Sequence, residues 1–360
     1  MRLLYITNTI CGRGGLERVL SVKTDYLVKH NYEVFIITLN QKEKTPDYSF
    51  NTDITYLDID TGEGRFFYVF RYLKGIKKYI RNVNPSIIIV CDDGLKGLWL
   101  PYFVNTKISF IYERHTSIFN TNKLLHNVMG RFIMRLGAKK YDKFVVLTKA
   151  GSAEWFSNNV QIIPNLLPFY PQNISTQSKS AAIAIGAISY VKAHDMLVDI
   201  WKIVNKNYPN WNLCIYGAKT DFYTNVKNKI KENYLENVIF LNEPVNDVML
   251  KYLDSSMFLM TSRKEGLPMV MMEAMSCGLP CISFDCPTGP AELIQNDYNG
   301  YLIPFGDLQT FADKVMYLIE NEEKRQLLGR NARNFISKYS VENIMRIWID
   351  LFDSLIQNKK

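Results

Sequence analysis

The stretch from Thr261 to Ile294 constrains the fold more than any other part of the chain. Phe258 to Thr261 is an apolar run of strand length, and Gly266-Leu267-Pro268 follows it after a short polar segment. Glycine lets the backbone approach a ligand closely, and proline is favoured in the first turn of a helix. The pattern therefore predicts a strand, a loop and a helix N-terminus, whose unpaired N–H groups suit a phosphate.

Two glutamates, Glu265 and Glu273, lie eight residues apart around this helix start. Eight residues are a little over two helical turns, so a helix from Pro268 to Ser276 would turn both carboxylates in roughly the same direction. Ionised carboxylates accept strong hydrogen bonds from sugar and ribose hydroxyls, so the pair beside a phosphate site indicates a sugar nucleotide. The alternative is an apolar core helix with two solvated glutamates.

The motifs around this helix resemble those of a known enzyme family. Glu265-x7-Glu273 is followed by Gly278-Leu279-Pro280 and then by Pro287-Thr288-Gly289-Pro290-Ala291-Glu292. Together they are similar to the nucleotide-sugar site of the retaining glycosyltransferases of family 4, in the branch that builds bacterial surface polysaccharides. The resemblance implies the α/β GT-B fold, in which two Rossmann-like, doubly wound domains enclose an interdomain cleft.

The length and composition suit two domains. With 360 residues, 47% of them hydrophobic, the chain can bury a core in each domain. The resemblance implies an acceptor-binding domain at residues 1–170 and a nucleotide-sugar-binding domain at residues 181–340. Residues 171–180 are polar and rich in turn formers, which predicts a linker. In GT-B proteins the last helix, here within 341–360, packs back on the first domain.

Three expectations concern where elements end. Phe144 to Thr148 is predicted to be the last strand of the first domain, with Val160 to Asn165 crossing toward the second. Two amphipathic helices are predicted from Leu308 to the end of the chain. The run Asp92-Asp93-Gly94 follows a strand, so its acids could bind acceptor hydroxyls or cap the next helix; we favour capping.

A second candidate loop lies near the N-terminus. A strand leads into Gly12-Arg13-Gly14-Gly15-Leu16-Glu17, and such a glycine loop before a helix is typical of a phosphate or nucleotide edge. Glu17 stands where the dinucleotide fingerprint needs its third glycine, so a nicotinamide cofactor is disfavoured. The resemblance implies that Gly14 and Gly15 face the cleft, and that His115 lies near the reacting end of the sugar. A tight turn without a ligand is the alternative at the glycines.

The resemblance also implies cations that bind the diphosphate of the donor. Relatives carry an arginine and a lysine after the first strand of the second domain, and this chain has Ala187 and Lys192 there. Losing an arginine fork weakens phosphate binding. Either another cation, for which Arg263 is the candidate, takes its place, or the protein is slow. The implied catalytic residues are His115, Lys192 and Glu265. The implied donor-binding residues are Gly14, Gly15, Lys192, Arg263, Glu265, Gly266, Leu267, Pro268 and Glu273.

A basic, aromatic helix is predicted from Arg65 to Arg81. Its apolar positions recur at helical spacing, and its basic face consists of Arg71, Lys74, Lys78 and Arg81. Its predicted apolar face is Phe66, Phe70, Leu73, Ile76 and Ile80. Such helices lie well on anionic membranes, although a packed helix with a solvated face is the alternative. Residues 1–170 carry 23 Lys and Arg against 14 Asp and Glu, whereas 171–360 carry 20 against 21, so the first half favours an anionic partner.

Composition also limits the cofactors and the location. The six cysteines lie mostly in apolar stretches, and Cys277, Cys281 and Cys286 lack a CxxC pair, so we expect buried thiols and no metal. No apolar run approaches the roughly 20 residues that span a bilayer, and no secretory signal precedes the first strand. We therefore expect a cytoplasmic protein that can associate peripherally with the inner face of the membrane.

The resemblance implies transfer of a hexose or N-acetylhexosamine from a nucleotide sugar, preferably UDP-linked, to a glycan or polyprenyl-linked acceptor. The expected reaction retains the anomeric configuration and needs no metal or other cofactor. A non-catalytic relative that binds sugar nucleotide or lipid is the main alternative, because of Ala187. A sugar-nucleotide epimerase lacks a suitable arrangement of carboxylates and histidines. The pI near 9.0 would suit a nucleic-acid-binding protein, but we do not expect that function.

Overall fold

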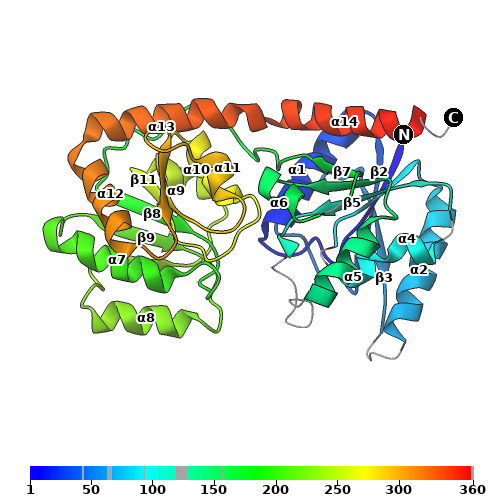
Figure 1. Ribbon diagram of the computed structural model, residues 1–360, viewed down its shortest axis with the longest axis horizontal. Coiled ribbons are helices and arrows are strands. Elements are labelled where there is room, and N and C mark those ends of the chain that lie inside the picture. The colour runs from blue at the N-terminus through cyan, green and yellow to red at the C-terminus, as the bar shows by residue number, and fades with distance from the viewer. Residues whose placement is uncertain are drawn as a thin grey trace. The chain divides into compact units, whose positions relative to one another are not determined.

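The computed structural model describes residues 1–42, 44–62, 67–92, 94–104, 106–118, 128–155 and 157–357. The chain divides into two units (Figure 1). Unit 1 contains Met1–Pro168 and Val341–Lys360, and unit 2 contains Phe169–Ser340. Each unit is built on its own parallel sheet.

Unit 1 contains seven parallel strands in the order β3-β2-β1-β4-β5-β6-β7. Strands buried on both faces read as continuous apolar runs, as the all-isoleucine-and-valine strand β4 does. The strands are β1 (Arg2–Ile6), β2 (Glu33–Leu39), β3 (Thr55–Ile59), β4 (Ile87–Val90), β5 (Ser109–Arg114), β6 (Lys143–Val146) and β7 (Val160–Ile162).

Helices cover the sheet of unit 1. Side chains of α2, α3, α4 and α5 share one core cluster with the strands, whereas α1 contacts the C-terminal helix α14. Helix α14, near the end of the chain, belongs to unit 1. The helices are α1 (Gly15–Lys29), α2 (Tyr68–Val83), α3 (Leu95–Leu98), α4 (Leu100–Phe103), α5 (Val128–Ala138), α6 (Lys149–Ala153) and α14 (Val341–Gln357).

Unit 2 contains six parallel strands in the order β10-β9-β8-β11-β12-β13. The strands are β8 (Ala181–Ile185), β9 (Asn212–Tyr216), β10 (Ile239–Asn242), β11 (Met257–Met260), β12 (Cys281–Asp285) and β13 (Gly300–Pro304). Its helices are α7 (His194–Asn207), α8 (Tyr223–Glu232), α9 (Val248–Leu253), α10 (Met269–Ser276), α11 (Pro290–Leu293), α12 (Leu308–Glu320) and α13 (Glu322–Ile336), followed by the 3-10 turn η3 (Ser337–Tyr339). Helices α7, α8 and α12 share one core cluster with the strands.

Both sheets are doubly wound, which confirms the predicted fold class. In unit 1 the strand order reverses between β1 and β4, and in unit 2 it reverses between β8 and β11. Open parallel sheets bind ligands outside the carboxyl ends of the strands at such a reversal. The loops after these four strands are therefore where each unit should carry a site.

The structure corrects two sequence expectations about element limits. Val160 to Asn165 does not simply cross between domains, because Val160–Ile162 pairs with β6 and forms the seventh strand. The end of the chain from Leu308 contains three helices and a 3-10 turn rather than two helices. Short strands such as β7 carry little sequence signal. Only Asn321 separates α12 from α13, so the sequence pattern does not show where one helix ends and the next begins.

The segment 171–180, expected to be a linker, contains no helix or strand and is fastened to unit 2. Ser175 donates a hydrogen bond to the carbonyl of Ser255 (2.5 Å), and the Gln177 side chain donates to the carbonyl of Gly278 (2.8 Å). Arg325 of α13 in turn donates to the carbonyl of Gln177 (3.1 Å). The sequence showed the turn-rich composition of this segment but not these long-range contacts.

Candidate active site

An ion pair lies at the strand reversal of unit 2. Lys192 follows β8, Glu265 follows β11, and the Lys192 Nζ is 2.7 Å from the Glu265 Oε1. Both side chains are mostly buried. The two strands are neighbours in the sheet although 73 residues separate the pair in sequence. Two residues that the sequence analysis assigned to the same site are thus in direct contact.

Gly186 leaves room for the side chain of Lys192. Gly186 directly follows β8 and has a φ of +150°, which L-residues with side chains rarely adopt. A Cβ at this position would come within 3.0–3.2 Å of the Lys192 side-chain carbons. Gly186 therefore lets the aliphatic part of Lys192 lie against the backbone while its ammonium reaches Glu265.

Arg263 is engaged by an acid of its own. Its two terminal nitrogens lie 3.1 and 2.8 Å from the two carboxylate oxygens of Asp195, and its guanidinium stacks 4.0 Å from the Tyr190 ring centroid. The hydrogen bonds that Arg263 donates to the Asp195 carboxylate raise the pKa of Arg263. Burial would raise the pKa of Asp195, but the bonds from Arg263 outweigh it and lower that pKa. A phosphate would have to compete with Asp195 for Arg263, so its replacement of the missing arginine stays a prediction.

The loop of Gly266, Leu267 and Pro268 is packed against a second loop. Thr288 donates a hydrogen bond to the carbonyl of Glu265 (2.5 Å), and Gly289 has a φ of +79°. A Cβ at Gly289 would overlap the Gly266 carbonyl oxygen and come 2.8 Å from the Pro268 Cδ. Leu267 and Pro268 are buried, and Pro268 immediately precedes α10. The predicted loop and helix start are therefore confirmed as structure.

Glu273 lies inside α10 and is buried, with 2% of its surface exposed. The hydroxyl of Tyr252 is 3.1 Å from the Glu273 Oε2 and 3.0 Å from the carbonyl of Val270. The helix is apolar on nearly every side, as the core-helix alternative expected. That alternative also expected a solvated glutamate, which is wrong for Glu273 because its side chain is buried. A buried carboxylate needs a hydrogen-bond partner, and Tyr252 supplies one.

In unit 1, His115 directly follows β5 and faces a buried acid. The His115 Nε2 is 3.4 Å from the Glu113 Oε1, and the Lys23 Nζ of α1 is 2.7 Å from the Glu113 Oε2. Lys23 also lies 3.3 Å from the ring centroid of Trp348 in α14. Burial would raise the pKa of Glu113, but the Lys23 ammonium and His115 hold it well below its usual value.

Glu17, which follows the glycine loop of unit 1, is a charged group close enough to interact with His115. Gly14 is the N-cap of α1 and Gly15 its first residue, and a Cβ at Gly14 would overlap the Glu17 carboxylate. Burial raises the pKa of Glu17, an effect that the charge of His115 partly offsets and that of Asp47 reinforces. The loop and His115 are therefore electrostatically coupled within unit 1.

One set of possible metal ligands lies in the described part of the chain. Cys91, Glu113 and His115 offer ligand atoms within 4.8 Å of one another. The set does not fit a metal ion, because the Lys23 ammonium already provides the positive charge beside Glu113. A divalent ion there would have to sit close to that ammonium, at a high electrostatic cost. Activity without a metal stays a prediction.

Helix α2 only partly matches its predicted faces. Arg71, Lys74, Lys78 and Arg81 are all exposed, as the basic face required. Phe70 is wrong as a core residue, because 65% of its surface is exposed. The buried positions of α2 are Tyr72, Ile76, Ile80 and Val83. Arg65 and Phe66, predicted to begin the helix, lie outside the described residues.

The Asp92 carboxylate does not act as the N-cap of α3. It accepts hydrogen bonds from the Gly94 N–H (2.8 Å) and from the Asn8 side chain (3.1 Å), while Gly94 is the N-cap residue. Lys96 lies 3.5 Å from the other carboxylate oxygen. Asp92 therefore stabilises the turn before α3, and its neighbour Asp93 lies outside the described residues.

Several residues of both sites escaped the sequence analysis. Lys23 had a usable signal, because it interrupts the apolar stripe of α1 at a position that faces the core. Asp195 and Tyr252 had none, because their partners lie 68 and 21 residues away and only the fold brings them together. The missed residues are Lys23, Glu113, Asp195, Tyr252 and Trp348.

Two doubly wound sheets, each with polar residues at its strand reversal, define the GT-B class of proteins. Comparison with solved structures agrees: HepE of Anabaena, in complex with UDP and glucose, superposes with a TM-score of 0.78. The likeness covers 98% of this chain and 100% of that chain at 15% sequence identity, so it shows the fold alone.

Sequence comparison narrows the class further. Residues 171–335, which lie within unit 2, match the family model of glycosyl transferases group 1. The amylovoran biosynthesis glycosyltransferase AmsD of Erwinia amylovora is 29% identical over 366 residues, covering 98% of this chain and 99% of that protein. The lipopolysaccharide 1,6-galactosyltransferase of Escherichia coli is 23% identical over 342 residues, covering 89% and 90%. The chain thus has bacterial glycosyltransferases as homologues.

Proposed function

We propose that the chain is a retaining glycosyltransferase of family 4 that moves a hexose or N-acetylhexosamine from a UDP-sugar to a glycan or lipid-linked acceptor. The observation that carries the proposal is the Lys192–Glu265 pair at the strand reversal of unit 2, beside the Gly266 loop and the start of α10. This position supplies a cation, a carboxylate and backbone N–H groups at the edge where doubly wound sheets bind nucleotides.

The proposed chemistry divides the donor between these groups. Lys192 and the N–H groups after Gly266 stabilise the negative charge that develops on the departing diphosphate. A carboxylate has about four lone-pair sites on two oxygens, so Glu265 can hold Lys192 and a sugar hydroxyl together. Glu273 is proposed to hold the ribose by its place in the motif. Attack of the acceptor on the face from which the diphosphate leaves retains configuration without an enzyme nucleophile, and His115 positions the reacting sugar.

The names of relatives support the proposed donor and acceptor. HepE was solved with UDP and glucose, and the Escherichia coli relative is named for galactosyl transfer to lipopolysaccharide. AmsD is named for amylovoran biosynthesis. These names favour a hexose donor linked to UDP and an acceptor in the biosynthesis of a bacterial surface polysaccharide, made in the cytoplasm.

The first test replaces the charge of Glu265 and keeps its shape. Glu265→Gln should lower the transfer rate about 10²-fold or more, because a preorganised electrostatic contact to the reacting group is worth that much. The matched control is Glu243→Gln, which removes the acid of another Lys–Glu pair of unit 2, Lys219–Glu243 at 2.5 Å. Product formation from a panel of UDP-sugars measures both variants. Equal transfer by the wild type and Glu265→Gln would refute the assignment.

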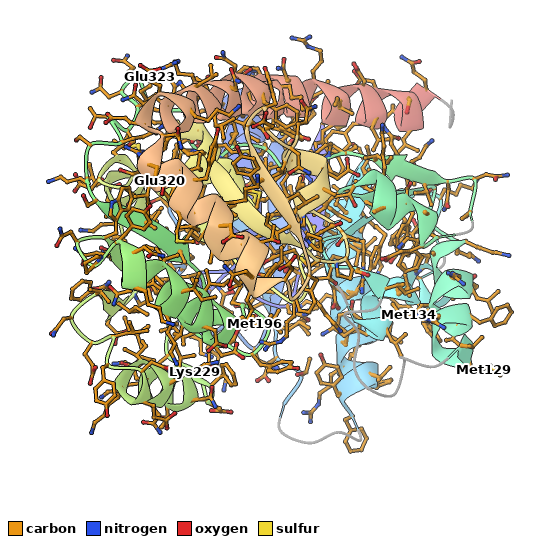
Figure 2. The ribbon with its side chains drawn as sticks, turned by 60° about the vertical axis from the view of Figure 1, so that its left-hand side comes forward. Met129, Met134, Met196, Lys229, Glu320 and Glu323 are labelled. Atoms are coloured by element: carbon orange, nitrogen blue, oxygen red, sulfur yellow. The ribbon has the colours of Figure 1, made fainter. Side chains whose placement is uncertain are left out.

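We also propose that unit 1 rests on an anionic membrane. In addition to the exposed basic residues of α2, unit 1 has exposed apolar side chains on α5. They are Val128, Met129, Phe132 and Ile133. Figure 2 labels Met129, which is 64% exposed, and Met134 of the same helix, which is buried. Helices α2 and α5 contain no Asp or Glu. Basic and apolar side chains without acids suit the boundary between headgroups and acyl chains.

Vesicle sedimentation tests this partner. The protein should bind vesicles that contain phosphatidylglycerol at low salt, and replacing Lys74 and Lys78 by Gln should release it, because each basic residue near an anionic surface contributes about 1 kcal/mol. The control variant replaces two exposed lysines of α8, Lys227 and Lys231, and should bind as the wild type does. Equal binding by both variants would contradict a surface on α2. Among the described residues, no helix is long and apolar enough to cross a bilayer.

A non-catalytic relative is the second candidate function. Its supporting observation is Ala187, because Arg263, the expected substitute for a missing arginine, is already bound to Asp195. Such a protein would bind UDP-sugar without turnover. The two candidates separate in one comparison, since both predict ligand binding and only the enzyme predicts release of UDP.

A further inference from the structure

Polar side chains from three elements meet at the strand reversal of unit 1. Asn8 follows β1 and Asp92 follows β4, and the Asn8 amide donates to the Asp92 Oδ1 (3.1 Å). Lys96 of α3 donates to the Asn8 side-chain oxygen (2.5 Å) and to the hydroxyl of Tyr68 in α2 (2.9 Å). Its ammonium lies 3.5 Å from the Asp92 Oδ2. The cluster therefore lies where open parallel sheets bind their ligands.

The start of α3 is shaped around Asp92. A Cβ at Gly94 would come 2.9 Å from the Asp92 Oδ1, and a Cβ at Gly97 would come 2.9 Å from the Asp92 Cβ. The Gly94 N–H also donates to Oδ1 (2.8 Å). A side chain at either glycine would displace the carboxylate, so the backbone itself fixes the position of Asp92.

The two carboxylate oxygens of Asp92 differ in their partners. Oδ1 accepts the bonds from Asn8 and Gly94, whereas Oδ2 has no hydrogen bond to any residue that the structure describes, although Asp92 is only 2% exposed. The buried hydroxyl of Tyr72 in α2 has no such partner either. Burial, and then the charge of Asp92, raise the pKa of Tyr72, so the two groups interact. Buried polar groups are almost always hydrogen-bonded, which makes Oδ2 the atom of this cluster that still needs a donor.

The charges of the cluster select a hydroxyl rather than an ion. An anionic ligand would be repelled by the buried Asp92 carboxylate, and a metal ion would be repelled by the Lys96 ammonium. A hydroxyl can donate to Oδ2 and accept from Lys96 at the same time. The Lys96 side chain is 24% exposed and has a flexible four-carbon stem, so its ammonium can move aside and admit a hydroxyl to Oδ2.

We propose that Asp92 and Lys96 form a subsite for a sugar hydroxyl of the acceptor, which donates to the Asp92 Oδ2 and accepts from the Lys96 ammonium. Asn8 and Tyr68 hold Lys96 in place. The proposal rests on the proposed function in taking this sugar to be part of the acceptor. It gives Asp92 the acceptor role that the sequence left open beside capping.

Saturation-transfer NMR on the full-length protein tests the subsite with defined probes, the methyl glycosides of glucose, galactose and N-acetylglucosamine. At least one probe should bind the wild type saturably. Asp92→Asn removes the charge and keeps the shape, and should weaken the binding of that probe about ten-fold or more. The reason is that a hydrogen bond to a charged group is worth about one to two powers of ten in a binding constant. Lys96→Gln, at a partly exposed position that the fold tolerates, should weaken it as well.

Two further variants locate the bound sugar. Asp25→Asn makes the same exchange in another ion pair of unit 1, Lys29–Asp25 at 2.7 Å, and should bind the probe as the wild type does. Glu265→Gln should also keep the binding, because Glu265 lies in unit 2. Circular dichroism checks the fold of every variant.

Four results would overturn the proposal. They are a folded wild type that binds no probe, full binding by both Asp92→Asn and Lys96→Gln, equal weakening in Asp25→Asn, and loss in Glu265→Gln alone. Full binding by the first two variants would leave the cluster with ordered water only, and the last result would place the sugar in the donor site.

The thermal shift of the wild type with UDP-sugars separates this proposal from the proposed function. Probe binding that depends on Asp92, without a shift by any UDP-sugar, would refute the proposed function and leave the sugar subsite standing. A shift by a UDP-sugar without probe binding would remove the subsite and leave the proposed function standing.

Discussion

At the scale of single residues, both candidate sites depend on charges that are buried in pairs. Lys192 with Glu265 and Lys23 with Glu113 each bring a cation within 2.7 Å of a carboxylate. The sequence identified Lys192 and Glu265 because their motifs are specific. It missed Lys23 because a lysine in a helix usually points to solvent, and only the packing of α1 against β5 and α14 reveals its partner.

The pH dependence of stability should report a buried histidine near the donor site. Burial, and then the charge of Lys192, lower the pKa of His194 from 6.5 to about 4. The unfolded chain therefore binds the proton first, so the free energy of unfolding falls as the pH drops from about 6.5 toward 4. The loss at pH 4 should be about 3 kcal/mol, since one pKa unit corresponds to 1.36 kcal/mol.

Urea unfolding between pH 7 and pH 5 measures this loss in a range where most carboxyl groups stay ionised. His194→Gln should flatten the profile, whereas His30→Gln, which removes an exposed histidine, should leave the slope unchanged. A wild-type stability that is constant across the range would contradict a neutral, buried His194.

At the scale of elements, the loops after β8, β11 and β12 form the candidate site of unit 2, and the helices behind them hold the loops. The sequence placed β11 to within one residue at each end, because it is a short apolar run followed by turn formers. It failed at β7, whose three residues give no recognisable pattern, and at the apolar face of α2, where Phe70 is exposed. Periodicity shows that a helix has an apolar face but not which side the neighbouring elements leave open.

Two glycines of unit 2 separate loop packing from backbone strain. Gly289 and Gly306 have similar φ angles, +79° and +89°, but only Gly289 is in contact with another loop, that of Gly266. Alanine should cost strain at both positions, and Gly289→Ala should cost about 1–3 kcal/mol more, because it overpacks the contact. It should also weaken UDP binding, which Gly306→Ala should not. Thermal unfolding and calorimetry with UDP measure both effects, and equal behaviour of the two variants would contradict the role of this loop contact.

At the scale of the whole molecule, the sequence predicted the doubly wound fold, and the structure confirms it in two separate sheets. The prediction succeeded because the motifs between Glu265 and Glu292 are specific, and the resemblance that they carry implies this fold. Details of the site depend on single long-range contacts, such as Asp195 with Arg263, and no local pattern encodes them. The match of residues 171–335 to glycosyl transferases group 1 covers most of unit 2, the unit in which the Lys192–Glu265 pair lies.

The most direct test of the central claim is the thermal stability of the full-length protein with UDP and a panel of UDP-sugars. A ligand that binds only the folded state stabilises it by about 2.7 kcal/mol at a concentration of 100 times its Kd. The account predicts a saturable rise in Tm of several degrees with one UDP-sugar, and a much smaller rise in the folded Glu265→Gln variant. A folded wild-type protein whose Tm is unchanged by every donor and by UDP would contradict a nucleotide-sugar site in unit 2.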